Sequence, residues 1–185
     1  MESPLTEKKC QFGVEQIEFF GYVFSKYGLK PSPDNVRAVK ECGVPENKET
    51  VRSFLGMAGY LDNFIKNYAA IAAPLYQLTR KETKFAWGKQ EKEAFRKIQD
   101  NISSEKTMAF FDPSKPIILR TEASFNEGLS AGLLQKTDRR IQPVHFFSRT
   151  MTETEKRHSQ TEKRCFGNQM GQGEAENLPT WSPQI

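Results

Sequence analysis

Apolar residues between positions 51 and 65 recur at every third or fourth place, and this spacing constrains the fold more than any other feature. Residues spaced in this way line one face of an α-helix, and such a face needs a second apolar surface to cover it. The spacing predicts a helix from about Lys48 whose inner face carries Val51, Phe54, Leu55, Ala58, Leu61, Phe64 and Ile65. This part of the chain is therefore expected to fold as packed helices.

Weaker helical patterns lie on either side of this helix. Asp34 is placed to cap a short helix that ends before Gly43. A second short helix is expected over residues 75–79, with Pro74 at its first turn, where the missing N–H of proline is tolerated. A third helix is expected from about residue 89 to 103, and its inward face would carry Phe95, Ile98 and Ile102. Together these helices predict a small bundle.

Strand-type patterns occur before and after the helices. Residues 11–25 are rich in Phe, Val, Ile and Tyr with breaks at Gly13 and Gly21, which predicts a hairpin of two short strands. Tyr27 and Gly28 then turn the chain. Beyond a proline-containing linker, residues 117–121, 128–135 and 142–148 form three runs with short connections, which predicts an antiparallel meander.

The end of the chain carries little periodicity. A helix is expected to begin near Thr152, because Thr152 or Thr154 precedes Glu155 as in a capping box, but no apolar face follows. From Cys165 onward glycine, proline and polar residues dominate, and this composition buries too little surface to offset the entropy of ordering. Residues 165–185 are therefore expected to be a disordered tail.

Charge and cysteine content narrow the classes of partner. The 185 residues include 27 basic and 23 acidic side chains, with a net charge of +4, which permits a polyanionic partner. Basic and acidic residues interleave, so solvated faces explain the charge as well.

Cys10, Cys42 and Cys165 are too far apart for a disulfide framework or a metal cluster. No apolar run approaches the roughly 18 residues of a membrane span, so we expect a soluble, intracellular chain with no membrane partner.

Short motifs between about residues 8 and 163 follow one another in a specific order and spacing. Together they resemble the Pol polyproteins of gypsy-type long-terminal-repeat retrotransposons, in which a reverse transcriptase runs into an RNase H domain. The motifs include Glu18-Phe19-Phe20-Gly21-Tyr22, Phe64-Ile65-Lys66-Asn67-Tyr68, Ala72-Ala73-Pro74-Leu75, Thr121-Glu122-Ala123-Ser124, Phe147-Ser148-Arg149 and His158-Ser159-Gln160-Thr161-Glu162-Lys163. The resemblance stops after Lys163, which suggests a frameshift, a splice junction or a truncated coding sequence.

The resemblance implies an α+β fold in four parts. Residues 1–30 would be the end of the polymerase palm with a primer-grip-like β-hairpin, and residues 31–111 thumb-like or connection-like helices. Residues 112–164 would be an incomplete RNase H-like domain with a truncated, antiparallel three-stranded sheet, followed by the disordered tail at 165–185. A sheet without covering helices exposes an apolar face and an unpaired edge, so marginal stability is expected from residue 112 onward.

The resemblance also implies RNA-directed DNA synthesis and cleavage of RNA in RNA–DNA hybrids. In the family, clustered carboxylates hold Mg²⁺ or Mn²⁺ for two-metal hydrolysis. The first carboxylate of that cluster, an Asp in the family, is Glu122 here, and the second position is Arg164, a cation. No Tyr-x-Asp-Asp polymerase motif occurs. Glu122 is therefore the candidate catalytic and metal-binding residue, displaced by about one methylene, and we expect catalysis to be impaired.

Candidate nucleic-acid contacts follow from the same comparison. Tyr22 and Lys26 belong to the primer-grip-like hairpin, while Arg139, Arg140 and Arg149 lie near the predicted RNase H-like strands. Core packing of the tyrosine and simple solvation of the arginines are the alternatives. Two interpretations stay open: a reverse transcriptase/RNase H fragment that is inactive alone, or a non-enzymatic nucleic-acid-binding remnant or non-functional relic. An RNA–DNA hybrid is the expected partner, and association with a longer Pol product is a further expectation.

Overall fold

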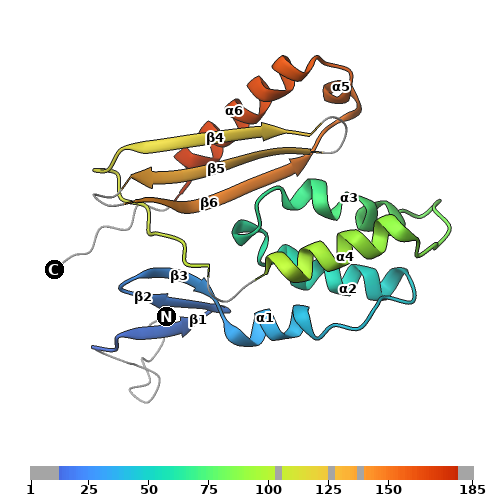
Figure 1. Cartoon of the computed structure of the whole chain (residues 1–185), viewed down its shortest axis with the longest axis horizontal. Helices are drawn as coiled ribbons and strands as arrows, with labels where there is room; N and C mark the ends of the chain where they lie inside the picture. The colour runs from blue at the N-terminus through green and yellow to red at the C-terminus, as the bar shows by residue number, and fades with distance from the viewer. Residues whose placement is uncertain (1–12, 103–105, 125–127, 137–139, 179–185) are drawn as a thin grey trace, which may run out of the picture.

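The computed structural model describes residues 13–102, 106–124, 128–136 and 140–178 (Figure 1). It confirms a mixed α+β fold in which helices are combined with two antiparallel sheets of three strands each. The elements are β1 (Gln16–Phe19), β2 (Tyr22–Ser25), β3 (Gly28–Pro31), α1 (Pro33–Lys40), α2 (Lys48–Gly59), the 3-10 turn η2 (Asp62–Phe64), α3 (Tyr68–Leu78), α4 (Lys89–Asn101), β4 (Ile117–Ala123), β5 (Gly128–Lys136), β6 (Ile141–Thr150), α5 (Glu153–Lys156) and α6 (Gln160–Glu176).

The predicted hairpin is present but gains a third strand. β1 pairs with β2 as expected, and after the turn at Tyr27 the chain returns as β3, which pairs with β2 from Gly28 to Pro31. Leu29 on β3 exchanges two backbone hydrogen bonds of 2.8 Å with Met108. This bridge joins the first sheet to the segment that leads into the second sheet. The two-strand prediction therefore ended the sheet one strand early.

The strongest predicted helix is confirmed and forms the centre of the main core. Asn47 and Thr50 close a reciprocal capping box at the start of α2, and Val51, Phe54 and Ala58 are fully buried. The Phe54 and Phe95 rings lie 4.5 Å apart and join α2 to α4. The helix ends at Gly59, and η2 carries the apolar face onward to Ile65. The predicted single helix to Ile65 is thus two elements.

Two predictions about helix ends were wrong. Ser32, not Asp34, caps α1, because its hydroxyl accepts from the Asn35 amide and Pro33 occupies the first helical position. Pro74 lies inside α3 rather than at its first turn. Proline leaves the carbonyl one turn earlier without its helical partner. Burial of most of α3 between the other helices and the second sheet outweighs that loss.

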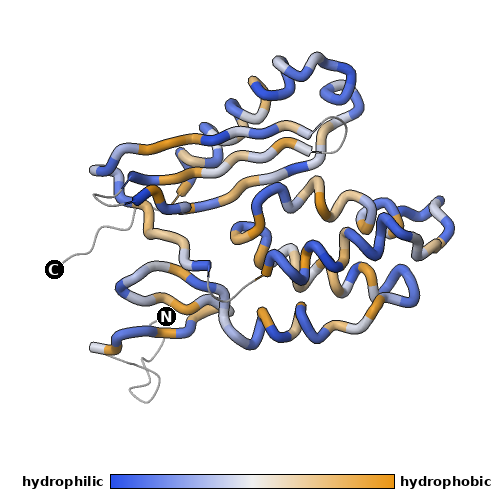
Figure 2. The backbone as a smooth tube through the Cα atoms, in the orientation of Figure 1, coloured by the Kyte–Doolittle hydropathy of each residue, from blue (hydrophilic) through white to orange (hydrophobic). Residues whose placement is uncertain are grey.

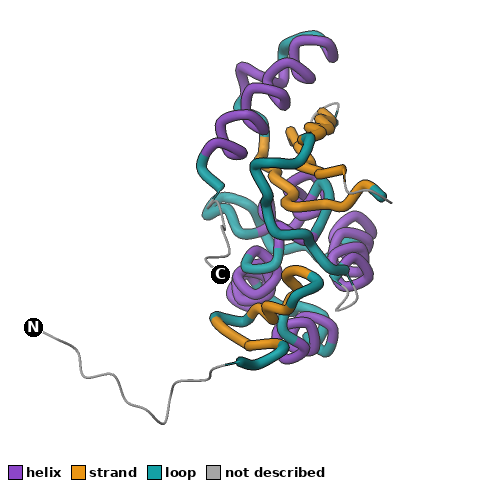
Figure 3. Tube along the Cα trace, turned by 90° about the vertical axis from the view of Figure 1, so that its left-hand side faces the viewer, coloured by secondary structure: helices purple, strands orange, loops and turns teal. Residues whose placement is uncertain are grey.

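The second sheet has the order β4-β5-β6, and the three predicted strands are confirmed with longer bounds. One face packs on α3 and η2, and the Phe146 side chain joins the helical core from that side. The other face packs on α6, as Figure 3 shows from the side. Both faces are therefore covered, and the expectation of an exposed apolar face was wrong. On its outer side β4 has no strand partner among the described residues.

The expectation of disorder from Cys165 is wrong for the residues up to 178. Ser159 and Glu162 form a capping box, and α6 then continues through the glycine-rich stretch to Glu176. Figure 2 shows little apolar character along this helix. Gly167 and Gly171 are buried against the sheet instead, since a Cβ on Gly171 would lie 2.7 Å from the Ala131 Cβ. These glycines take the place of an apolar stripe and let α6 approach the sheet closely. Residues 179–185 lie outside the described residues.

Helix α5 begins after Thr152 with the predicted capping box to Glu155, although it spans a single turn. None of the helices in the described ranges is long and apolar enough to cross a membrane.

Candidate nucleic-acid interface and carboxylate site

The tip of the first hairpin holds two exposed phenylalanine rings on a strained turn. Phe20 and Gly21 both have positive φ angles, of 45° and 67°, as in a type I′ turn. Such a φ is rare for a bulky residue, yet the Phe20 side chain is 74% exposed and meets the Phe19 ring edge-on, with ring centroids 4.4 Å apart. Strain of this kind persists only where the surroundings hold it, and it is concentrated at functional sites.

Three hydrogen bonds from neighbouring helices hold this turn. The Tyr60 hydroxyl donates to the Phe20 carbonyl. The Gly21 carbonyl accepts from the Ser32 amide at 2.9 Å and from the Asn35 side-chain amide at 3.3 Å. The tip is thus a platform bound to α1 and to the end of α2.

Tyr22 faces inward from the same hairpin. Its ring stacks on the Tyr60 ring at 5.2 Å, and its hydroxyl donates to the Tyr60 carbonyl at 2.9 Å. Burial and the neighbouring Tyr60 raise the pKa of Tyr22 to about 12. Tyr22 therefore supports the platform. Lys26 lies in the exposed next turn, with its ammonium 5.2 Å from the centroid of the Tyr27 ring.

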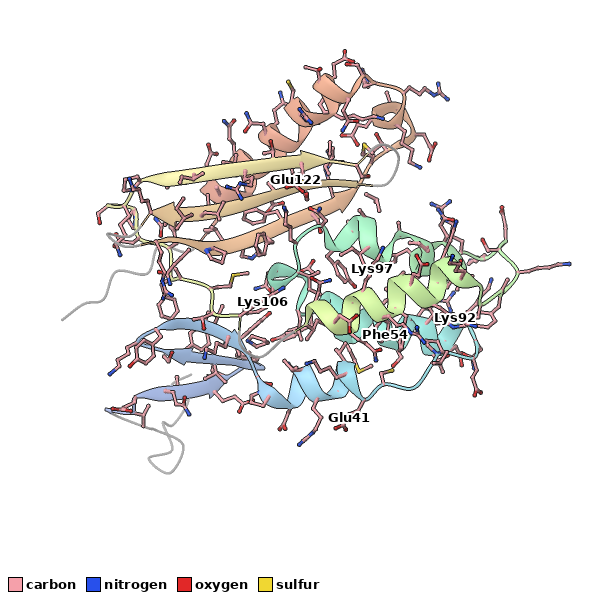
Figure 4. All side chains as sticks on the ribbon, in the orientation of Figure 1. Glu41, Phe54, Lys92, Lys97, Lys106 and Glu122 are labelled. Atoms are coloured by element: carbon pink, nitrogen blue, oxygen red, sulfur yellow. The ribbon has the colours of Figure 1, made fainter. Side chains whose placement is uncertain are left out.

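Glu122 lies near the end of β4, on the face of the second sheet that packs on α3 and η2 (Figure 4). Its Oε1 lies 2.5 Å from the Lys66 ammonium, and its Oε2 accepts from the Asn67 side-chain amide at 3.1 Å. These two donors lower the pKa of Glu122 below its usual value. Both carboxylate oxygens are engaged by groups from the segment that precedes α3.

The donors around Glu122 do not suit the two-metal centre of the family. Such a centre needs several carboxylates converging on one point. No grouping of three or more His, Cys, Asp or Glu side chains that could hold a metal ion occurs in the described ranges. Instead Lys66 and Arg120 line the small cavity beside Glu122, and Arg164, at the second family position, is exposed on α6. Cations stand where the chemistry of Mg²⁺ or Mn²⁺ requires anions.

The remaining candidates are spread over the second sheet. Arg149 at the end of β6 forms a two-point ion pair with Glu155, at 2.8 Å and 2.6 Å, which joins β6 to α5. Arg140 is exposed just before β6, and Arg139 lies outside the described residues. The predicted residues therefore occupy separate elements rather than one site.

Sequence reasoning missed residues that contact the candidate residues but lie far from them in the sequence. Tyr60 supports the hairpin from position 60, and Lys66 and Asn67 reach Glu122 from more than fifty positions away. Lys66 and Asn67 belonged to a recognised motif, but nothing in that motif indicates its contact with a distant strand.

Known proteins resemble this chain in sequence and in fold. Residues 87–170 match the family described as the RNase H-like domain found in reverse transcriptase. The Transposon Tf2-3 polyprotein of Schizosaccharomyces pombe is 31% identical over 160 residues, which are 86% of this chain. The chain belongs to the gypsy-type retrotransposon Pol polyproteins. It spans 12% of the length of that relative, and the Transposon Tf2-4 polyprotein gives the same values.

Solved structures show that this segment shares the fold of part of a foamy viral protease-reverse transcriptase. A foamy viral protease-reverse transcriptase in complex with double-stranded DNA matches with a TM-score of 0.72 and 19% identity, over 88% of this chain and 29% of that chain. A second structure, in complex with an RNA/DNA hybrid, gives a TM-score of 0.73 and 19% identity, over 91% of this chain and 23% of that chain.

Proposed function

We propose that this Pol segment binds nucleic acid through the hairpin tip and does not by itself cleave RNA in RNA–DNA hybrids. The observation that carries the binding proposal is the turn at Phe20 and Gly21, whose strained backbone holds exposed aromatic rings. Lys26 lies in the exposed turn at the other end of β2 and is proposed as a second contact. Aromatic rings stack on bases without regard to sequence, and a lysine contacts the phosphate backbone. The preferred ligand is an RNA–DNA hybrid with a single-stranded overhang, in keeping with the ancestral role of the family.

The absence of cleavage is proposed from the carboxylate site. Hydrolysis by two metals needs more than one carboxylate, and Glu122 already binds Lys66 and Asn67. Incubation of a labelled hybrid in Mg²⁺ or Mn²⁺ should give no more product than the Glu122→Gln variant. Cleavage that this substitution abolishes would refute the proposal.

Binding is tested with a variant that keeps the turn and removes the ring. Asparagine adopts positive φ more readily than other residues, so Phe20→Asn should preserve the backbone. Loss of a base-stacking ring should weaken binding at least about fivefold in fluorescence anisotropy, since such stacking contributes roughly 1–3 kcal/mol. Equal affinity of Phe20→Asn and the unmodified chain would exclude the tip as a nucleic-acid platform.

Lys26 is tested against a matched lysine on another surface. Lys26→Ala should lower the slope of log affinity against log salt by about one, because one phosphate contact is lost. Lys92→Ala is the control, since Lys92 is exposed on α4 and lies away from the hairpin in Figure 4. Equal effects of the two substitutions would indicate a non-specific charge effect.

A second candidate function is association with a longer Pol product. All four residues of β1 are exposed, and in the described ranges its outer edge has no strand partner. Such an edge is a template for a strand from another chain. Co-elution with a separate polymerase palm segment should depend on Ile17, which is 38% exposed, and should be lost on Ile17→Lys.

A further inference from the structure

Three polar side chains form a row across the second sheet, one on each strand. Glu122 on β4 lies directly opposite Ser130 on β5, and Ser130 lies directly opposite Ser148 on β6. Residues opposite one another in a sheet point to the same face. The row therefore offers a carboxylate and two hydroxyls on the face that turns toward the helices.

The segment from Lys66 to Ala69 crosses this row and contacts each member. Lys66 and Asn67 bind the two oxygens of Glu122. The Asn67 side-chain carbonyl also accepts from the Ser130 hydroxyl, and the Ala69 backbone amide donates to the Ser148 hydroxyl at 3.0 Å. A short stretch at the start of α3 thus binds one polar side chain on each of the three strands.

The backbone of this segment is shaped for the contact. Asn67 adopts a left-handed conformation, with φ of 60° and ψ of 30°, and it is the residue before the first turn of α3. Its side chain makes no capping bond to α3. It is turned instead toward Glu122 and Ser130, so this left-handed residue binds the sheet and does not cap its own helix.

We propose that Glu122 is the anchor of a latch that holds the RNase H-like sheet against the helical part, with the Lys66 ammonium as the cation that pairs with its carboxylate. Glu122 is then a positioning residue. The extra methylene of glutamate relative to the family aspartate extends the carboxylate toward Lys66 and Asn67. The latch goes beyond the proposed nucleic-acid binding and does not depend on it, because the hairpin tip contributes no group to it.

The first test is a charge swap in the full chain, read by hydrogen exchange of the Ala69 amide, which the latch protects directly. Lys66→Glu and Glu122→Lys should each speed this exchange about two- to fivefold, within the range of a half-exposed ion pair, and the double variant should restore at least half of the protection. Lys115→Met is the matched control, since it breaks a similarly half-exposed 3.0 Å ion pair with Asp112 in the segment before β4. Additive losses in the double variant, or no change in either single variant, would overturn the latch.

Milder variants keep the test decisive if a reversed charge prevents folding. Glu122→Asp restores the family residue but shortens the side chain, so it should speed Ala69 exchange as Glu122→Gln does. In 1 M NaCl, where the Debye length is about 3 Å, exchange in the unmodified chain should approach that of Glu122→Gln. Full protection in Glu122→Asp would contradict the proposal.

Manganese distinguishes the latch from a metal site without an activity assay. Paramagnetic Mn²⁺ should cause no saturable broadening of the Glu122 and Ala123 amide signals in the unmodified chain. Broadening that Glu122→Gln abolishes would show that Glu122 recruits metal and would overturn the latch. This outcome is separate from failure of the proposed function, which is read by nucleic-acid affinity and cleavage.

Discussion

Tyr22 and Tyr60 hold the hairpin to the end of α2 through stacked rings and hydrogen bonds in both directions. The Tyr22 hydroxyl donates to the Tyr60 carbonyl at 2.9 Å, and the Tyr60 hydroxyl donates to the carbonyl of Phe20, two residues before Tyr22 in the chain. The ring centroids lie 5.2 Å apart with an angle of 22° between the planes. The exposed tip at Phe20 is therefore supported by a residue forty positions away.

Tyr60→Phe removes the hydroxyl and keeps the stacked ring. The change should lower the free energy of unfolding by about 0.5–1.5 kcal/mol, as for loss of one hydrogen bond, and should weaken nucleic-acid binding because the Phe20 turn loses a restraint. Chemical denaturation and anisotropy measure the two effects. Tyr76→Phe, which alters another partly exposed tyrosine, should leave binding unchanged; an equal loss there would argue against a role for the Tyr60 contact.

Gly21→Ala tests the geometry of the turn. Gly21 has a φ of 67°, and a Cβ at this position would lie 2.2 Å from the Asn35 side-chain nitrogen. Strain and collision together should destabilise the protein by about 1–3 kcal/mol in a urea melt. Gly43→Ala is the control, since a Cβ there meets nothing within 4 Å. A melt of Gly21→Ala that coincides with that of Gly43→Ala would contradict the described turn.

Two glycines of α6 should respond in opposite directions. Gly171→Ala places a Cβ 2.7 Å from that of Ala131 and should lift the helix from the sheet, at a cost of about 1–3 kcal/mol. Gly173→Ala meets nothing within 4 Å and should stabilise α6 by about 0.5–1 kcal/mol, since alanine favours helix more than glycine. Thermal melts of the full chain compare them. Destabilisation by neither substitution would show that α6 does not pack on β5 as described.

Glu155 predicts a pH dependence at the β6–α5 junction. Arg149, together with Thr152, lowers the pKa of Glu155 to about 2 from an ordinary value near 4.5. A carboxylate with a lowered folded-state pKa stabilises the fold above its unfolded pKa, and this contribution is lost as the pH falls from about 4.5 to about 2. Unfolding followed between pH 6 and pH 2 should show a shallower acid loss in Glu155→Gln. Parallel curves for the two proteins would contradict the pair.

Local patterns predicted much of the fold because local chemistry determines these elements. The spacing of apolar residues around Phe54 defines an inner helical face in any context, and Thr152 with Glu155 forms a cap from a few neighbouring residues. The strands of the second sheet followed from alternating residues and turn signals for the same reason. The family and the position of Glu122 also followed from short motifs in order.

Other features depended on contacts that the local sequence does not contain. Alone, the stretch after Cys165 has too few apolar residues to order itself, but Gly167 and Gly171 allow a close fit once the sheet is present. Pro74 is tolerated inside α3 because the helix is buried on several sides.

The residues of this protein by themselves determined its family, its α+β class and the replacement of the family aspartate by Glu122. Only the tertiary structure decided what that carboxylate contacts, since Lys66 and Asn67 reach it across the boundary between helices and sheet. The physical reason is range: helix periodicity and capping act over a few residues, whereas ion pairs and close packing act between any groups that the fold brings together.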